Sequence, residues 1–213
     1  MYVYYIQMSV LNIRFTELEL KIATYLFKHY KQKYNPRQLA KLLSINHAHA
    51  HTLCNTLTKK NLLIKENLGN SFYFTYNYST EITVQFMGYL LSLEETQIPG
   101  HLLVLRYNLQ KFKPYLQLGL LFGSSIKSPN FQDIDILLMY SKSNTKQIKD
   151  IKEEIRKSQL IEKPIRYVDI RQEDIEKNKE NNIFYNILSE NIIFHSPTTY
   201  IKIIQTCLKQ KNT

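Results

Sequence analysis

A glycine-serine pair and two aspartates, each next to an apolar run, constrain the fold of this chain more than any other feature. Gly123 and Ser124 come directly after the apolar segment Leu118–Phe122, and Asp133 and Asp135 open the next apolar segment. Residues two apart on a strand project from the same face, so we expect the two carboxylates to point together. Carboxylates held this close repel one another unless a cation lies between them, and Mg²⁺ prefers such oxygen ligands. The sequence therefore predicts a Mg²⁺ or Mn²⁺ site at the edge of a mixed α/β domain.

The glycine-serine turn also predicts contacts with phosphate. A glycine at a strand end lets the backbone approach a ligand closely, and the Ser124 hydroxyl with neighbouring N–H groups can hold a terminal phosphate oxygen. Ser125 and Lys127 are further candidate phosphate contacts, since they follow in the same turn. The alternatives for these two residues are a second turn-forming serine and a surface lysine. We predict Gly123, Ser124, Ser125 and Lys127 as nucleotide-binding residues.

This pattern resembles the minimal nucleotidyltransferases of the DNA polymerase beta superfamily. The strings that carry the resemblance are Leu-Phe-Gly-Ser-Ser at 121–125 and Asp-Ile-Asp-Ile-Leu at 133–137, within a similarity that covers residues 102–197. In that family a third acid on a later strand completes the metal site, and the matching position here is Asp169. The resemblance implies that Asp133, Asp135 and Asp169 are the metal ligands and catalytic residues.

The resemblance also implies a reaction. A hydroxyl of a protein, an RNA or a small molecule would attack the α-phosphate of a nucleoside triphosphate, and pyrophosphate would leave. The sequence departs from the family pattern in two places. Eight residues separate Ser124 from Asp133, about two fewer than is common, and Lys127-Ser128 stands where Arg/Lys-Gly is usual. The alternative is a DNA-binding regulator whose nucleotidyltransferase-like domain is catalytically weak or inactive.

The first third of the chain predicts three helices and a hairpin. Thr16 with Glu19 three residues on, and Asn35 before Pro36, are typical helix starts. A third helix is expected to end near Lys60, followed by strands at 62–65 and 71–76 around a glycine-containing turn. This order resembles a winged helix-turn-helix, notably in the strings at 38–46 and 57–63.

The predicted third helix has a polar outer face. With Ala50, Leu53 and Leu57 directed inward, its outer side chains are short polar groups that can reach phosphates or base edges of double-stranded DNA. These DNA-contacting candidates are His47, His49, His51, Thr52 and Asn55. His47 and His51 are also spaced for a metal ion, which is the alternative to solvated or DNA-facing histidines. Residues 1–78 hold ten Lys or Arg and three Asp or Glu, the charge excess of a nucleic-acid binder or of a lysine-rich proteome.

The fold class expected is α+β in two domains, a winged helix-turn-helix followed by a polymerase-beta-like nucleotidyltransferase α/β domain. The boundaries are 1–78 for the first domain, 79–101 for a helical connector and 102–213 for the second. The apolar part of 79–101 predicts either a packed connector or a helix of a homodimer. Two distant cysteines and the lack of an apolar run of about 20 residues predict a cytoplasmic protein without a membrane anchor.

Overall fold

The computed structural model describes residues 14–209 and divides the chain into two compact units. The first unit extends to Met87 and the second begins at Gly88, so the boundary lies inside helix α4 (Glu81–Ser92). Four apolar residues of α4 between 86 and 91 are buried within the chain. This burial is compatible with the packed connector that the sequence predicted as one of two alternatives for the segment.

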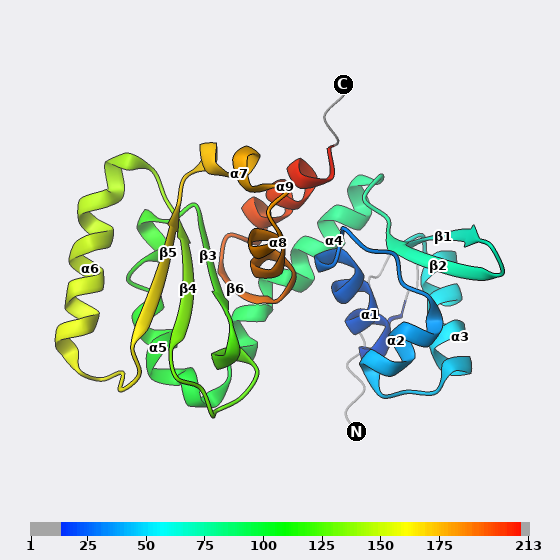
Figure 1. Cartoon of the computed structure of the whole chain (residues 1–213), viewed down its shortest axis with the longest axis horizontal. Coiled ribbons are helices and arrows are strands. Elements are labelled where there is room, and N and C mark those ends of the chain that lie inside the picture. Colours follow the sequence, from blue (N-terminus) through cyan, green and yellow to red (C-terminus); the bar gives the residue numbers. More distant parts are fainter. Residues whose placement is uncertain (1–13, 210–213) are drawn as a thin grey trace. The chain divides into compact units, whose positions relative to one another are not determined.

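The first unit has the element order that the sequence predicts (Figure 1). Its elements are α1 (Glu17–Lys28), α2 (Pro36–Leu43), α3 (His47–Lys59), β1 (Leu63–Leu68) and β2 (Ser71–Tyr76). Strand β1 continues three residues beyond the predicted end, because Gly69 and Asn70 alone make the turn and Leu68 pairs with Ser71. Gly69 adopts a φ of +59°, a conformation that glycine reaches without steric cost. A backbone bridge between Tyr34 and Phe74 ties the segment before α2 to the hairpin.

Local side-chain contacts explain why α1 and α2 begin where they do. The Thr16 hydroxyl accepts a hydrogen bond from the Glu19 backbone, and the Glu19 carboxylate accepts one from the Thr16 backbone at 2.7 Å. Asn35 and Gln38 form the same reciprocal pair at the start of α2. Each pair satisfies two backbone donors that have no partner inside the helix. The Lys60 ammonium lies 2.7 Å from the same Glu19 carboxylate, which links the end of α3 to the start of α1.

The second unit is a mixed α/β domain. Its helices and strands are α5 (Leu103–Leu109), β3 (Leu118–Phe122), β4 (Ile134–Met139), α6 (Thr145–Ser158), β5 (Ile165–Ile170), α7 (Gln172–Asn178), α8 (Asn182–Ser189), β6 (Asn191–His195) and α9 (Pro197–Leu208). Helices α7 and α9 are additions to the elements predicted from the sequence. Residues 113–115 form a 3₁₀ turn before β3, because Pro114 fits a turn and cannot donate to a strand ladder.

The four strands form one sheet in the order β5-β4-β3-β6. Strand β4 runs antiparallel to β3 and parallel to β5, and β3 also pairs with β6. Leu121, Ile136 and Leu138 belong to one hydrophobic core with Ile148 and Ile155 of α6. Figure 1 shows α6 on one side of the sheet and α8 and α9 on the other. Each strand residue therefore points to one of the two faces of the sheet, and this decides which side chains meet.

In the described part of the chain, none of the helices has the length and apolar character needed to cross a bilayer.

Candidate functional site

The carboxylate of Asp135 lies directly against Gly123. The two residues are brought together because Phe122 pairs with Asp135 in the antiparallel ladder of β3 and β4. A methyl group at position 123 would stand 2.3 Å from Asp135 Oδ2, far inside van der Waals contact. Gly123 also has a φ of +82°, which side chains of L-residues rarely allow. The structure thus places the glycine turn next to Asp135 of the Asp-x-Asp pair.

Arg166 of β5 completes the cluster around the two aspartates. It is the register partner of Asp135 in the parallel ladder, so both side chains lie on the same face of the sheet. Arg166 Nη1 donates a hydrogen bond to Asp133 Oδ2 at 2.9 Å, and its Nε lies 3.7 Å from Asp135 Oδ1. Asp133 and Asp135 are partly buried, whereas the Arg166 side chain is 70% exposed. The guanidinium therefore covers the two carboxylates from the solvent side.

The charges of this cluster do not balance at Asp135. Burial raises the pKa of the Asp135 carboxyl, the neighbouring Asp133 charge raises it further, and Arg166 lowers it less than these two effects raise it. The hydrogen bond to Asp133, followed by the charges of Asp133 and Asp135, raises the pKa of Arg166. A proton or a cation that reaches Asp135 would relieve this unfavourable charge.

The structure does not bring Asp169, the predicted third ligand, together with Asp133 and Asp135. Asp169 pairs with Leu138, three residues after Asp135, which places it roughly 10 Å further along the sheet. Because side chains alternate between faces, Asp169 also lies on the opposite face. There the Lys152 ammonium of α6 donates to both carboxylate oxygens at 2.7 Å. Asp169 is held in a structural ion pair.

The residues predicted to contact phosphate differ in their exposure to solvent. Ser124 is exposed at the start of a short 3₁₀ turn, and its carbonyl accepts hydrogen bonds from the Lys127 and Ser128 backbones. Ser125 is fully buried, and its hydroxyl has no hydrogen-bond partner among the described residues. The Lys127 ammonium is paired with the Glu190 carboxylate. Of the predicted set, Gly123 and Ser124 remain open to a bound group.

The residues present do not fit a two-metal centre. Such a centre needs several carboxylates around the ions, and this cluster has two carboxylates with a guanidinium between them and the solvent. No group of three or more His, Cys, Asp or Glu in residues 14–209 is arranged to hold a metal ion. His47 and His51, whose ring centroids lie 6.5 Å apart, are not part of such a group of three in the described residues.

Two arginines of the second unit, which the sequence analysis did not single out, have defined partners. Arg166 holds the aspartates, and Arg171 donates to the Tyr140 carbonyl at 2.7 Å and lies over the Tyr140 ring. Alternation along β5 separates Arg166 from Asp169 onto different faces, a signal already present in the sequence. The register of β4 against β5 determines that Arg166, and not Asp169, lies beside Asp135.

The outer face of α3 is a second candidate site, in the first unit. His47, His49 and Thr52 are exposed, and His51 and Asn55 are partly buried. The Asn55 amide nitrogen lies 3.2 Å from His51 Nδ1, and the Lys65 ammonium of β1 donates to Asn55 Oδ1 at 3.2 Å. Asn55 therefore connects α3 with the hairpin. His47 and His49 are exposed to solvent, and the Thr52 hydroxyl, also exposed, donates to the Ala48 carbonyl at 3.0 Å.

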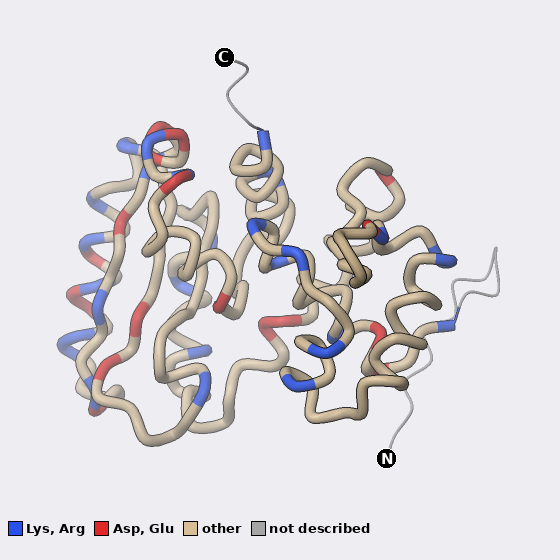
Figure 2. Tube along the Cα trace, turned by 45° about the vertical axis from the view of Figure 1, so that its right-hand side comes forward, with Lys and Arg blue, Asp and Glu red and all other residues tan. Residues whose placement is uncertain are grey.

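Positive charge on the first unit exceeds its negative charge, and part of this excess is unpaired. Figure 2 shows Lys and Arg along the trace with few acidic residues among them in this unit. Lys21, Lys33 and Lys60 each form an ion pair with a glutamate. Among residues 14–209, Arg37 and Lys41 of α2 form neither a hydrogen bond nor an ion pair through their side chains, and both are exposed. Unpaired cations on the helix before α3 are available to phosphates.

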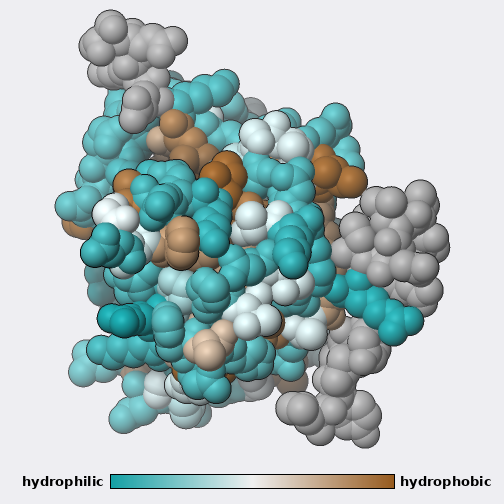
Figure 3. Space-filling model, turned by 90° about the vertical axis from the view of Figure 1, so that its right-hand side faces the viewer, coloured by the Kyte–Doolittle hydropathy of each residue, from teal (hydrophilic) through white to brown (hydrophobic). Residues whose placement is uncertain are grey.

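The surface at the hairpin end of the first unit is mainly hydrophilic, with separate hydrophobic patches (Figure 3). Ile64, Leu68 and Phe72 of the hairpin are each more than 40% exposed. The Lys65 ammonium lies 3.8 Å from the centre of the Phe72 ring, which places a cation on the hairpin beside an aromatic side chain.

Comparisons with known proteins leave the family open. No protein-family model and no curated protein matches the chain. A solved structure of the heme sensor protein PefR from Streptococcus agalactiae in complex with heme matches with 13% identity and a TM-score of 0.33, over 68% of this chain and 76% of that one. A TM-score this low carries no argument about fold or function. The resemblance to nucleotidyltransferases has no support beyond the residues and the sheet described above.

Proposed function

We propose that the protein is a DNA-binding regulator whose nucleotidyltransferase-like unit does not transfer nucleotides. The observation that carries the first part is the exposed polar face of α3 next to unpaired cations of α2. Side chains such as His49 and Thr52 suit base edges and phosphates in a major groove. Arg37 and Lys41 suit phosphates on either side, since backbone contacts position such a helix.

The cluster at Arg166 supports the second part of the proposal. Nucleotidyl transfer of the predicted kind needs metal ions held by several acids. Here the residue that pairs with Asp135 is Arg166, which carries a guanidinium. Asp169 forms an ion pair with Lys152 on the other face of the sheet. The remaining role of this unit is to bind an anionic ligand or to support assembly of the regulator.

Binding to DNA is tested by fluorescence anisotropy of the full chain with a labelled duplex at several salt concentrations. We expect binding that weakens steeply as salt increases, because neutralised phosphates release counterions. His47→Ala/His49→Ala should weaken binding, while Lys21→Ala should leave it unchanged, since Lys21 is already paired with Glu17. Lack of binding to any duplex pool at low salt would contradict the proposal.

Transfer is tested by incubating the protein with labelled nucleoside triphosphates, Mg²⁺ or Mn²⁺, and a cell lysate. We expect no label on protein, RNA or small molecules beyond that seen with Asp133→Ala/Asp135→Ala. Transfer that this double variant abolishes would restore the enzymatic hypothesis and reject the second part of the proposal. The DNA-binding result is independent of this outcome.

A further inference from the structure

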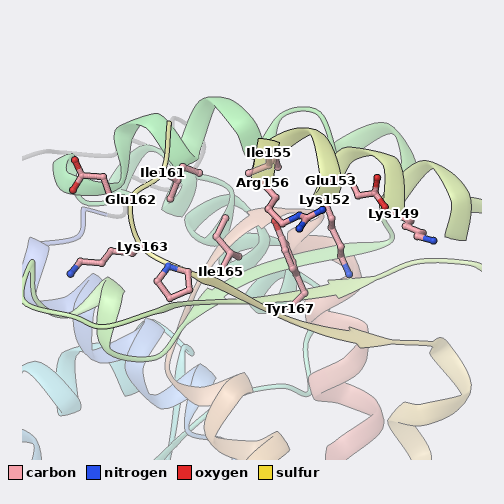
Figure 4. A pocket seen from close by; sticks show the side chains of 11 residues that line it. Lys149, Lys152, Glu153, Ile155, Arg156, Ile161, Glu162, Lys163, Ile165 and Tyr167 are labelled. Carbon is pink, nitrogen blue, oxygen red and sulfur yellow. The ribbon is translucent and has the colours of Figure 1, made fainter. Parts of the chain in front are cut away.

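A cavity of about 510 Å³ lies between α6, β5 and the segment that joins them (Figure 4). Its lining residues are Lys149, Lys152, Glu153, Ile155, Arg156, Ile161, Glu162, Lys163, Pro164, Ile165 and Tyr167. The volume falls within the roughly 300–1,000 Å³ usual for small-molecule sites. Ile165 and Tyr167 alternate with Arg166 along β5, so this cavity is on the opposite face of the sheet from Asp135.

The lining combines an apolar floor with an excess of positive charge. Ile155, Ile161 and Ile165 supply aliphatic surface. Four of the lining side chains are cationic and two are acidic. Lys152 is bound to Asp169, whereas Lys149, Arg156 and Lys163 have no side-chain partner in the described part of the chain. Of the two acids, Glu153 lies 3.8 Å from Lys157, outside the lining.

The hydroxyl of Tyr167 adds an unsatisfied polar group. It is buried and has no hydrogen-bond partner among residues 14–209. The ring is held by Phe112, at 6.0 Å between centroids, and by the Lys152 ammonium 4.5 Å from its centre. In Figure 4 the side chain reaches from β5 toward Arg156 of α6. A buried hydroxyl without a hydrogen-bond partner is unfavourable. A ligand oxygen that accepts a hydrogen bond from Tyr167 would therefore be stabilised.

We propose that this cavity binds a small organic anion with an apolar body. Arg156 would hold the anionic group, the Tyr167 hydroxyl would donate to one of its oxygens, and the three isoleucines would contact the body. An inorganic anion alone would leave the aliphatic floor exposed, and a neutral apolar compound would leave the cations without a partner. The lining therefore favours a molecule that has both an anionic group and an apolar body.

The probe for the test is 4-phenylbutyrate, compared with its neutral amide and with acetate by isothermal titration calorimetry on the full chain. We expect saturable binding of 4-phenylbutyrate with a Kd on the order of 1 mM or lower, given its size. The amide, which lacks the charge, should bind about tenfold more weakly, because a hydrogen bond to a charged group is lost. Acetate, which lacks the body, should show no saturable binding in the same range.

Three variants test the assignment of residues. Arg156→Ala should weaken binding of 4-phenylbutyrate about tenfold, while Lys146→Ala, an exposed lysine of the same helix outside the lining, should not. Tyr167→Phe should weaken binding without lowering the melting temperature of the free protein, since the hydroxyl has no partner there. Equal binding of acid and amide, equal effects of Arg156→Ala and Lys146→Ala, or no saturable binding at millimolar concentration would each overturn the proposal.

Discussion

Arg166 is the register partner of Asp135 across the parallel strands β4 and β5, and it also donates a hydrogen bond to Asp133 at 2.9 Å. One side chain therefore determines the character of the cluster. With an acid at this position, three carboxylates would share one face of the sheet. With arginine, the two carboxylates already have a counter-charge and have less need of a metal ion.

Arg166→Asp is expected to strengthen the binding of a divalent metal ion at the aspartate pair. The substitution removes the counter-charge and adds a third carboxylate on the same face as Asp133 and Asp135. Affinity for Mn²⁺, measured by calorimetry, should rise on the order of tenfold or more, because the charge facing the ion changes sign. Mn²⁺ should also raise the melting temperature of this variant more than that of the natural protein.

The matched control is Asp169→Asn. It removes a carboxylate from the opposite face, where Lys152 is its partner, so Mn²⁺ affinity should stay at the natural value. A loss of Mn²⁺ binding in Asp169→Asn, or no gain in Arg166→Asp, would contradict the register of β4 and β5 described above.

Asp135→Asn is expected to stabilise the protein near neutral pH. Burial and the Asp133 charge raise the pKa of Asp135 above its ordinary value of 3.8, so its charged form opposes folding. This destabilisation is absent below pH 3.8, grows as the pH rises to the folded-state pKa, and is constant above it. The variant should melt roughly 1–3 °C higher at pH 7, since the group is partly solvated.

The pH series of melting temperatures provides the check on Asp135→Asn. Its advantage should shrink as the pH falls through the folded-state pKa of Asp135 and disappear once the carboxyl is protonated in both states. A stabilisation that is the same at pH 3 and pH 7 would show that charge is not its cause.

Local signals in the sequence predicted most elements of the fold. Thr16 with Glu19, and Asn35 with Pro36, fix helix starts through contacts three residues apart, which a reader of the sequence can recognise. The order of helices and hairpin in the first unit follows from such signals. The sequence analysis did not predict helix α9. Apart from Pro197 at its start, the apolar period is the main signal for this helix in the sequence.

The site was predicted only as far as it depends on neighbouring residues in sequence. Gly123 and Asp135 meet through an antiparallel pair of consecutive strands, which short-range reasoning reaches. The partner from β5 depends on how two parallel strands align across a helix, and a shift of one residue changes the face of every side chain. This register places Arg166, and not Asp169, beside Asp135.

Gly123→Ala is expected to destabilise the second unit by about 2–3 kcal/mol, from overpacking and from strain at a positive φ. The added methyl group would meet Asp135 Oδ2 at 2.3 Å. Gly69→Ala separates the two causes, since Gly69 also has a positive φ but nothing within 4 Å of the added group. It should cost about 1 kcal/mol, measured by denaturant unfolding. A smaller effect at Gly123 than at Gly69 would show that Asp135 does not occupy this space.

The contribution of Asp135 to that cost is measured by a double-mutant cycle. In the background of Asp135→Ala, the carboxylate no longer opposes the methyl group, so Gly123→Ala should cost only the backbone strain of about 1 kcal/mol. If Gly123→Ala destabilises the Asp135→Ala variant as much as it destabilises the natural protein, the added methyl group clashes with a group other than the Asp135 carboxylate. The cycle tests the contact between Gly123 and Asp135 through the free energy of unfolding, so it does not depend on any activity of the protein.

Arg37→Ala and Lys41→Ala are expected to lower the salt dependence of DNA binding rather than its sequence preference. Each is an exposed cation on α2 without a side-chain partner in residues 14–209, so each can release about one counterion by contacting a phosphate. The slope of log K against log salt concentration should become shallower by about 1 for each substitution. Lys111→Ala is the matched control, because this exposed lysine of the second unit is already paired with Glu154. If the slope falls as much for Lys111→Ala as for Arg37→Ala, the positive charge acts without a defined surface, and the assignment of α2 to the phosphate backbone fails.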